Sequence, residues 1–249
     1  MTIALFDAWC GFGGRKPGMR GQVPASHLAD EMKRLGIGRA LAHTAPENLD
    51  IDELHSNAAL RADCELAGNL VPCPVILQNT PDLVPYEKEV SVLLARGVGA
   101  VCIRPKQDAW SLADWSSGGL FRAPSARRVP VFCKESEVSL EQAAELAARH
   151  PDLPIILTTL GYRSYRTLLP LLQTFPNISL AMGHAFSIHG VVEHLVATVG
   201  PERILFGTNF PDSEPMAAVT QLLYAGISDA DKALIGSGNI DRLLKGVLR

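Results

Sequence analysis

The chain has 249 residues, 47% of them hydrophobic and 20% charged, the composition of a globular protein with ample apolar material for a large core. Its 23 basic and 26 acidic residues leave a net charge of −3, and no run of Lys or Arg indicates a nucleic-acid or membrane surface. The apolar start, MTIALFDAWCGFGG, has no basic leader, and no segment approaches the roughly 20 apolar residues of a transmembrane helix.

The cysteines indicate a cytoplasmic protein. Their number, five, is odd, and no two of them form a CxxC pair. We therefore expect reduced core thiols at Cys10, Cys64, Cys73, Cys102 and Cys133.

Continuously apolar segments recur along the chain and alternate with helical patterns. An apolar run without polar alternation is typical of a strand that is buried on both faces, as in a parallel sheet. Eight such segments are predicted to be strands, at residues 3–8, 39–43, 70–77, 100–105, 129–134, 153–159, 178–182 and 203–209.

Two of the intervening helices have clear start signals. Residues 26–36 are predicted to form a helix that begins with a Ser26 cap. Residues 139–150 are predicted to form another, in which Ser139 and Gln142 have the spacing of a capping box.

Eight strand–helix units in a chain of about 250 residues are the pattern of a (β/α)8 barrel. We therefore predict an α/β fold with a single domain over residues 1–249, in which eight parallel strands close into one TIM barrel. The alternative is a doubly wound open sheet. No GxGxxG or P-loop follows a predicted strand, and GFGG at 11–14 lacks the required spacing, so the barrel is favoured.

The carboxyl ends of the strands are where a TIM barrel carries its functional residues. Polar and aromatic residues that end or follow the predicted strands are therefore the site candidates: Asp7, Trp9, Cys10, His43, Gln78, Asn79, Arg104, Lys106, Lys134, Glu135, Thr158, Thr159, Tyr162, Arg163, Arg166, His184, His189, Asn209 and Asp212.

Several segments resemble a known family. RILFGTNFP (203–211) and GNIDRLL (238–244) are similar to the last strand and the closing helix of the amidohydrolase-related (amidohydrolase 2 type) metal-dependent hydrolases. PNISLAMG (176–183) and LADEMKRLGIGRALAH (28–43) are similar to that family as well. The segment that begins at Tyr162, YRSYR, resembles a small subset of the family that lacks most metal ligands.

The resemblance implies metal ligands on the first, fifth, sixth and eighth strands, and this sequence departs from the pattern on each. The first strand has Asp7 and Trp9 but no His, the fifth and sixth end in Lys134 and Thr159, and the eighth ends in Asn209 where the family has an Asp. An amide cannot act as a general base, and an ammonium group repels a dication. We therefore expect a degenerate or absent metal site, at which a divalent metal such as zinc binds weakly if at all. Only His43, His184 and His189 could form a new site.

Basic side chains dominate the predicted mouth of the barrel. Arg104, Lys106, Lys134, Arg163 and Arg166 all lie at or just past strand ends, where Arg is suited to carboxylate recognition. Each of them could instead be a solvated charge or a salt-bridge partner, and Asn209 could simply tie its strand to the loop before Pro211. Trp9, Phe12 and Tyr162 are candidate apolar walls, and Cys10 is a weak nucleophile candidate without an identifiable base.

These residues divide into two predicted groups. The catalytic group is Asp7, His43, Lys134 and Asn209. The substrate-binding group is Trp9, Arg104, Thr159, Tyr162, Arg163 and His189, and no residue is assigned to a metal. We expect Asp7, His43, Arg104, Lys134, Thr159, His189 and Asn209 to converge on one pocket.

The sequence and the resemblance together predict a hydrolase of a small anionic substrate. Two alternatives stay open, namely a decarboxylase or lyase of the same superfamily and a barrel that binds a small carboxylate without turning it over. In each case the partner is a small molecule rather than a nucleic acid or a membrane, and a homo-oligomer is compatible with the sequence.

Overall fold

The computed structural model describes residues 3–13, 22–44, 53–78, 85–183 and 185–249. The described residues form eight parallel strands, each of which overlaps one predicted segment. The strands are β1 (Leu5–Phe12), β2 (Ile37–Thr44), β3 (Leu70–Pro72), β4 (Val101–Ile103), β5 (Val131–Lys134), β6 (Ile155–Thr158), β7 (Ile178–Met182) and β8 (Ile204–Phe206).

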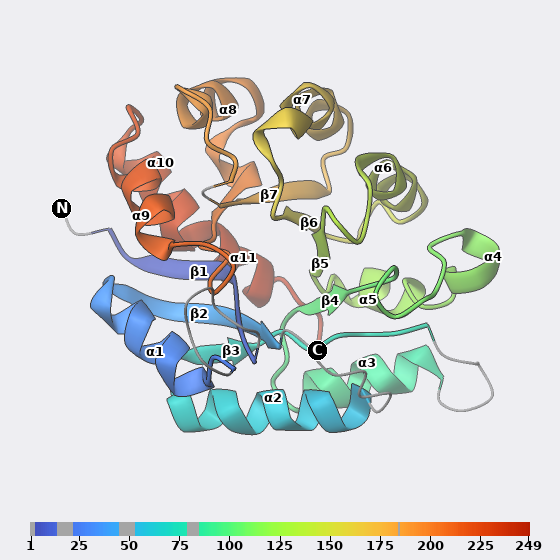
Figure 1. Ribbon diagram of the computed structural model, residues 1–249. Helices are drawn as coiled ribbons and strands as arrows, with labels where there is room; N and C mark the ends of the chain where they lie inside the picture. Colours follow the sequence, from blue (N-terminus) through green and yellow to red (C-terminus); the bar gives the residue numbers. More distant parts are fainter. Residues whose placement is uncertain (1–2, 14–21, 45–52, 79–84, 184) are drawn as a thin grey trace.

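Helices surround these strands (Figure 1). Along the chain they are α1 (Ala25–Arg34), α2 (Glu53–Ala67), α3 (Tyr86–Ala95), α4 (Asp114–Ser117), α5 (Arg122–Arg127), α6 (Leu140–Arg149), α7 (Tyr165–Thr174), α8 (Val191–Val199), α9 (Pro215–Leu223), α10 (Asp229–Ala233) and α11 (Asn239–Lys245). Two 3-10 turns, η1 (Tyr162–Ser164) and η2 (Pro201–Arg203), and one π-helical turn, η3 (Leu234–Gly238), complete the helical elements of the described residues. None of the described helices is long and apolar enough to cross a membrane.

Of the two predicted helix caps, the structure confirms one and contradicts the other. The capping box of α6 is confirmed, because the Ser139 side chain accepts from the Gln142 amide and the Gln142 side chain accepts from the Ser139 amide. The Ser26 cap of α1 is wrong. Pro24, which is fixed in an extended conformation, takes the N-cap position, and Ser26 already lies inside the helix.

The strands form a barrel whose ladder is interrupted twice. Regular pairing gives one sheet of β1-β2-β3 and another of β4-β5-β6-β7-β8, so regular pairing alone does not close the predicted barrel. After β3 the chain still reaches β4, since the Cys102 amide donates to the Pro74 carbonyl at 2.9 Å and the Ile76 amide donates to the Cys102 carbonyl at 3.0 Å. Pro72 and Pro74 lack an N–H, which explains why regular pairing stops there.

The seam between β8 and β1 is closed in the same irregular way. The Asn209 amide donates to the Trp9 carbonyl at 2.9 Å, and the Gly11 amide donates to the Phe210 carbonyl at 2.7 Å. Backbone hydrogen bonds therefore bridge both gaps between the sheets, and the eight-stranded barrel is confirmed in strand number, order and direction.

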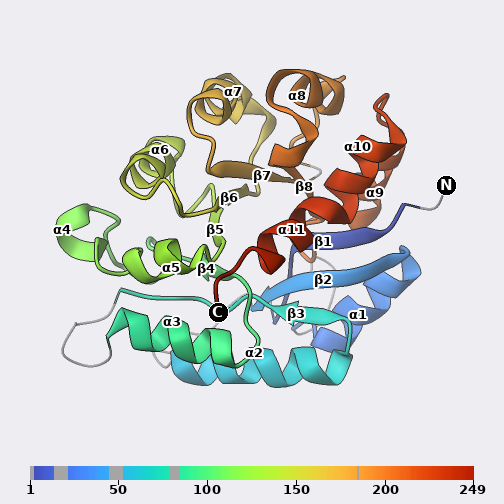
Figure 2. The same cartoon turned by 180° about the vertical axis from the view of Figure 1, so that it is seen from behind.

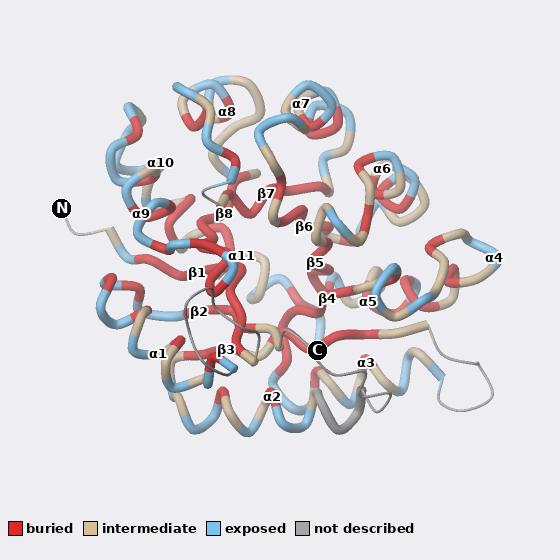
Figure 3. Tube along the Cα trace, in the orientation of Figure 1, coloured by how far each residue is buried: buried red, intermediate tan, exposed pale blue. Residues whose placement is uncertain are grey.

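Apolar side chains fill the structure in two layers. An inner cluster inside the barrel contains Phe6, Leu41, Phe132, Ile156 and Leu205, and a larger cluster lies between the strands and the helices. Figure 3 shows the buried strands and the exposed outer surfaces of the helices. All five cysteines are buried and unpaired, as predicted.

Helix α11 covers the amino-terminal end of the barrel, as Figure 2 shows from behind. Ile240 is buried in the inner cluster, and Leu243 and Leu244 pack against it. Asp241 forms an ion pair with Arg39, near the start of β2, at 2.9 Å. Because this end is filled by α11, the carboxyl ends of the strands are the place to look for a site.

Candidate functional site

A stack of aromatic rings lies at the carboxyl end of the barrel. The Trp9 ring stacks on His43 from the end of β2, with ring centroids 4.1 Å apart, and on Phe132 of β5 at 5.6 Å. A Cβ atom on Gly11 would lie 2.8 Å from the His43 ring, so only glycine lets this ring approach β1. Trp9 is 5% exposed, and its indole Nε1 has no hydrogen-bond partner.

The surroundings of His43 keep its imidazole neutral. Its Nδ1 lies 3.3 Å from the Thr44 carbonyl oxygen, which only accepts, so Nδ1 carries the proton and Nε2 is the acceptor nitrogen. Burial lowers the pKa of His43 to about 4, although the Thr44 carbonyl acts in the opposite direction. The charges of Lys134 and Arg104 lower this pKa further and that of Asp212 raises it.

Two cations reach the mouth, and each is paired with a carboxylate. Lys134 at the end of β5 forms an ion pair with Asp212 at 3.3 Å. Arg104, just after β4, donates from two nitrogens to the two oxygens of Asp108, at 3.1 and 3.3 Å. Sequence reasoning missed Asp108, although its position four residues after Arg104 was a usable signal.

Asp7 lies beneath the mouth and is fully buried. Its carboxylate accepts hydrogen bonds from the Trp9 amide at 3.0 Å, from the Thr208 amide at 3.0 Å and from the Thr208 hydroxyl. Burial raises the pKa of Asp7 to about 6, against the opposing effect of these donors. The contacts tie β1 to the segment after β8, and a direct catalytic role for Asp7 stays a prediction.

Thr159 and Asn209 form a second pair at the mouth, from the ends of β6 and β8. The Thr159 hydroxyl donates to the Asn209 amide oxygen at 3.2 Å, and the Asn209 amide nitrogen donates to the Ser213 hydroxyl at 3.2 Å. Both Thr159 and Asn209 have a left-handed backbone, with φ of 60° and 57°. A β-branched residue rarely adopts this conformation, and such strain is concentrated at functional sites.

The segment after β8 joins these groups. It supplies Thr208 to Asp7, Asn209 to Thr159 and Asp212 to Lys134. Residues from the ends of β1, β2, β4, β5, β6 and β8 therefore lie at the mouth: Asp7, Trp9, His43, Arg104, Lys134, Thr159, Asn209 and Asp212. Their expected convergence on one pocket stays a prediction. Sequence reasoning missed Thr208 and Ser213.

Other candidates have different surroundings. Tyr162 and Arg163 lie in η1 and are exposed, and the Arg163 Nε donates to the Tyr162 hydroxyl at 3.3 Å. Glu135 holds this turn by accepting from the Gly161 amide and the Ser164 hydroxyl. No contact found in the described ranges joins Tyr162 or Arg163 to the aromatic stack.

In the part of the chain that the structure describes, the remaining candidates lie apart from these contacts, except Thr158, whose hydroxyl accepts from the Thr159 hydroxyl at 3.4 Å. His189 and Arg166 are exposed, and His189 is within electrostatic range of Glu193. Lys106 donates to the Ser136 carbonyl at 2.7 Å. Gln78 is partly buried after β3, Thr158 is buried at the end of β6, and the positions Asn79 and His184 lie outside the described residues.

Two candidates are corrected by their surroundings. Phe12 is not a wall of the mouth, because it is buried in the cluster between strands and helices. The pairing register of β1 shifts between Asp7 and Cys10, which changes the direction in which the later residues point. Burial raises the pKa of the Cys10 thiol well above its usual range, so the thiolate that a nucleophile needs is disfavoured in this environment.

The donor groups at the mouth do not fit a zinc ion. Zinc at a hydrolytic site takes three ligands from His, Asp, Glu or Cys, and no such group of three occurs among the described residues. The oxygens of Asp7 and Asn209 already accept hydrogen bonds, and Lys134 brings a positive charge. We therefore derive no chemical step through a metal, and the expected metal content stays a prediction.

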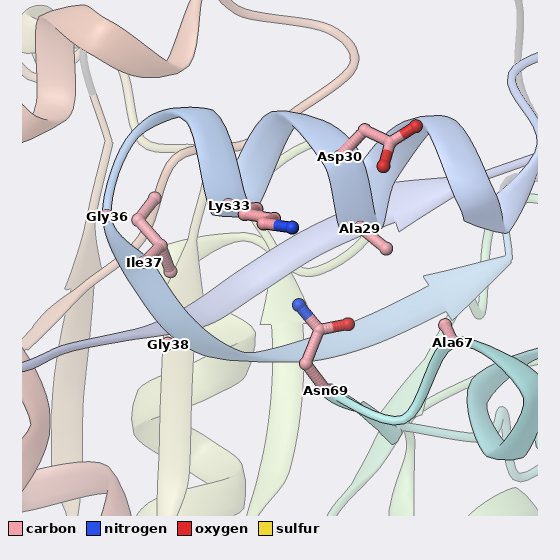
Figure 4. Close-up of a pocket in the computed structure, with 8 residues that line it drawn as sticks. All are labelled: Ala29, Asp30, Lys33, Gly36, Ile37, Gly38, Ala67 and Asn69. Carbon is pink, nitrogen blue, oxygen red and sulfur yellow. The ribbon is translucent and has the colours of Figure 1, made fainter.

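A pocket of about 470 Å³ opens elsewhere, at the amino ends of the strands (Figure 4). It is lined by residues of α1, of the start of β2 and of the turn before β3: Ala29, Asp30, Lys33, Gly36, Ile37, Gly38, Ala67 and Asn69. Lys33 and Asn69 project toward each other across it. None of the predicted site residues lines this pocket, and we place the candidate site at the opposite end, where the strained and charged residues converge.

Three solved structures show the fold of this chain in other proteins. A 2,6-dihydroxybenzoate decarboxylase from Rhizobium is 14% identical with a TM-score of 0.73, covering 98% of this chain and 99% of its own. A zinc-bound amidohydrolase from Burkholderia multivorans is 12% identical with a TM-score of 0.72, covering 97% and 99%. A probable 2-pyrone-4,6-dicarboxylic acid hydrolase from Acinetobacter baumannii, with citric acid bound, is 11% identical with a TM-score of 0.68, covering 98% and 100%.

At these identities the likeness to solved structures shows the fold alone, which is the TIM barrel. No curated protein matches the chain. The sequence motifs and the closing helix, however, have a counterpart in a family model. The Amidohydrolase (Amidohydro_2) model matches residues 15–246, and the chain therefore belongs to the amidohydrolase family.

Proposed function

We propose that this protein is a hydrolase of a small, carboxylate-bearing substrate, which binds at the carboxyl end of the barrel beside Lys134 and the Trp9–His43 stack. The observation that carries the proposal is a set of hydrogen-bond donors at this end that the protein's own contacts leave unused. A substrate carboxylate would accept hydrogen bonds from them.

The donors can be counted group by group. The Lys134 ammonium has three N–H bonds, of which the contact with Asp212 uses one, and the Arg104 guanidinium has five, of which Asp108 receives two. The Trp9 N–H has no partner although its residue is 5% exposed. A buried donor without a partner is costly, and a ligand oxygen would remove that cost. A carboxylate offers two such oxygens.

Two of the structural relatives support the choice of a carboxylate. The Rhizobium enzyme acts on 2,6-dihydroxybenzoate, and the Acinetobacter structure has citric acid bound. Both molecules are small carboxylic acids. Their proteins share this fold, so the same end of the barrel could hold a molecule of this class.

Hydrolysis would use His43 as the general base. Its Nε2 accepts a proton from water while the water oxygen attacks a substrate carbonyl, and the protonated ring then returns the proton to the leaving group. The Lys134 ammonium and the Trp9 N–H are the donors available to stabilise the oxygen that gains negative charge. Because burial lowers the pKa of His43 to about 4, the base is unprotonated at neutral pH.

The test is hydrolysis of esters and lactones that also carry a free carboxylate group, in water enriched in ¹⁸O. We expect one ¹⁸O atom in the acid product. His43→Gln should lower kcat by on the order of 10²–10⁴, whereas His194→Gln in α8, an exposed histidine that contacts Tyr165, should leave it unchanged.

Two other outcomes would overturn the proposal that the protein is a hydrolase. Release of CO₂ from hydroxybenzoates without ¹⁸O incorporation would identify a decarboxylase. Binding of these acids with no turnover of any compound would identify a barrel that binds carboxylates without reacting them.

A further inference from the structure

The ion pair between Lys134 and Asp212 has the chemistry of a bound ligand. Asp212 lies on the segment between β8 and α9, and its carboxylate contacts the Lys134 ammonium at 3.3 Å. This is the same group that the proposed substrate would present to the same cation. We infer that Asp212 is a built-in stand-in for the substrate carboxylate, and that an anionic ligand binds to Lys134 by displacing it. The inference rests on the proposed function, since it needs a carboxylate ligand at Lys134.

Exposure makes this pair exchangeable. The side chains of Lys134 and Asp212 are 34% and 56% exposed, and ion pairs with this much solvent contact contribute little to stability. The Arg104–Asp108 pair differs, with exposures of 19% and 17%, two parallel hydrogen bonds and a spacing of four residues. Arg104 is therefore held by its partner, whereas Lys134 can be released.

The backbone around Asp212 is fixed, so only its side chain has to move. Asn209 and Ser213 are joined both by a backbone hydrogen bond of 3.1 Å and by the contact between their side chains. Pro211 is buried on the other side of Asp212. Among the described residues, Lys134 is the one for which a contact of the Asp212 side chain is found. Rotation of this side chain toward solvent would free Lys134 without rearranging the loop.

The exchange would select for charge. A neutral molecule cannot replace the carboxylate of Asp212 without leaving the charge of Lys134 uncompensated, since Arg104 keeps its own partner, Asp108. An anionic ligand leaves the net charge around Lys134 unchanged, because one carboxylate takes the place of another. Asp212 would thus exclude neutral analogues from the site, at the cost of competing with the substrate.

The experiment is a calorimetric titration with citrate, and in parallel with benzoate, of the full chain and four variants. We expect Asp212→Asn to bind both acids about two- to fivefold more tightly, as expected for loss of a weak competing pair. Lys134→Met should weaken binding by roughly tenfold or more and Lys134→Arg should retain it. Asp241→Asn, which breaks the exposed Arg39–Asp241 pair at the other end of the barrel, is the matched control and should change nothing.

The outcomes separate the inference from the proposed function. If the wild type binds and Lys134→Met does not, but Asp212→Asn binds equally or more weakly, the inference is overturned while the carboxylate site stands. If Asp212→Asn binds and the wild type does not, the result supports the inference, because the Asp212 carboxylate then competes strongly with the ligand for Lys134. If neither the wild type nor Asp212→Asn binds citrate or benzoate at millimolar concentration, both the inference and the carboxylate site are overturned. Thermal unfolding of each variant shows whether it is folded.

Discussion

The Thr159 hydroxyl, after β6, donates a hydrogen bond at 3.2 Å to the amide oxygen of Asn209, after β8, and both residues have a left-handed backbone. The amide of Asn209 also donates to Ser213. An amide makes both contacts without charge, in a position that is 8% exposed and next in the chain to Thr208, the partner of buried Asp7. This explains why an uncharged residue suits the end of β8.

Asn209→Asp should therefore destabilise the protein at neutral pH. It places a second negative charge near Asp7, and we expect a loss of about 1–3 kcal/mol in the free energy of unfolding, measured with urea. The loss should shrink at acidic pH, where the new carboxyl is protonated. Asn209→Ala separates the effect of the lost hydrogen bonds from that of the charge. Equal losses for the two variants at every pH would contradict this explanation.

Asp7 should make the stability depend on pH. Burial raises its pKa from an ordinary 3.8 to about 6, so the folded state binds this proton more tightly than the unfolded state does. The stabilisation from the bound proton is complete below pH 3.8 and is lost as the pH rises through 6. Between these two pH limits the bound proton changes the free energy of unfolding by about 3 kcal/mol.

Asp7→Asn removes this titration. Unfolding of the wild type and of Asp7→Asn at a series of pH values should show the difference between their unfolding free energies changing between pH 4 and 6, in favour of the wild type at the acid end. A difference that is constant over this range would show that the donors from Thr208 and Trp9 keep the carboxylate ionised throughout.

Removal of metal ions should leave the thermal stability of the protein unchanged. Elemental analysis of protein purified without chelators should find well below one zinc per chain, because the oxygens of Asp7 and Asn209 already accept hydrogen bonds and Lys134 is positive. Dialysis against EDTA, followed by added zinc, should not shift the thermal midpoint. One zinc per chain, bound by three protein ligands, would contradict this prediction.

Trp9→Phe should weaken citrate binding while keeping the aromatic stack. The change removes an N–H that has no partner in the protein, so any hydrogen bond that it makes is to a ligand or to water. We expect about a 5- to 10-fold weaker affinity. Trp110→Phe is the control, because the Trp110 Nε1 also has no partner but its ring packs against the layer between strands and helices. Equal effects of both variants would contradict a specific role of Trp9.

The barrel could be predicted from the sequence because the strands are mostly apolar and the crossovers between them contain helices. The site was predictable only in part. Arg104, Lys134 and Asn209 could be placed because they lie at or shortly after the ends of their strands. The Asp7–Thr208 contact joins residues 201 positions apart, and nothing local indicates it. Phe12 was misplaced because the register shift in β1 changes which residues face inward, and that shift depends on pairing with β2.

The irregular seam between β8 and β1 couples closure of the barrel to the site. The backbone bonds that bridge it run from Asn209 to Trp9 and from Gly11 to Phe210, and Asn209 and Trp9 both belong to the proposed site, while Gly11 packs against His43. A molecule that holds these side chains in place would also hold the bonds between the two sheets. The amide protons of Gly11 and Asn209 should therefore exchange with solvent more slowly when a carboxylate is bound, so that the point where the barrel closes reports occupancy of its mouth.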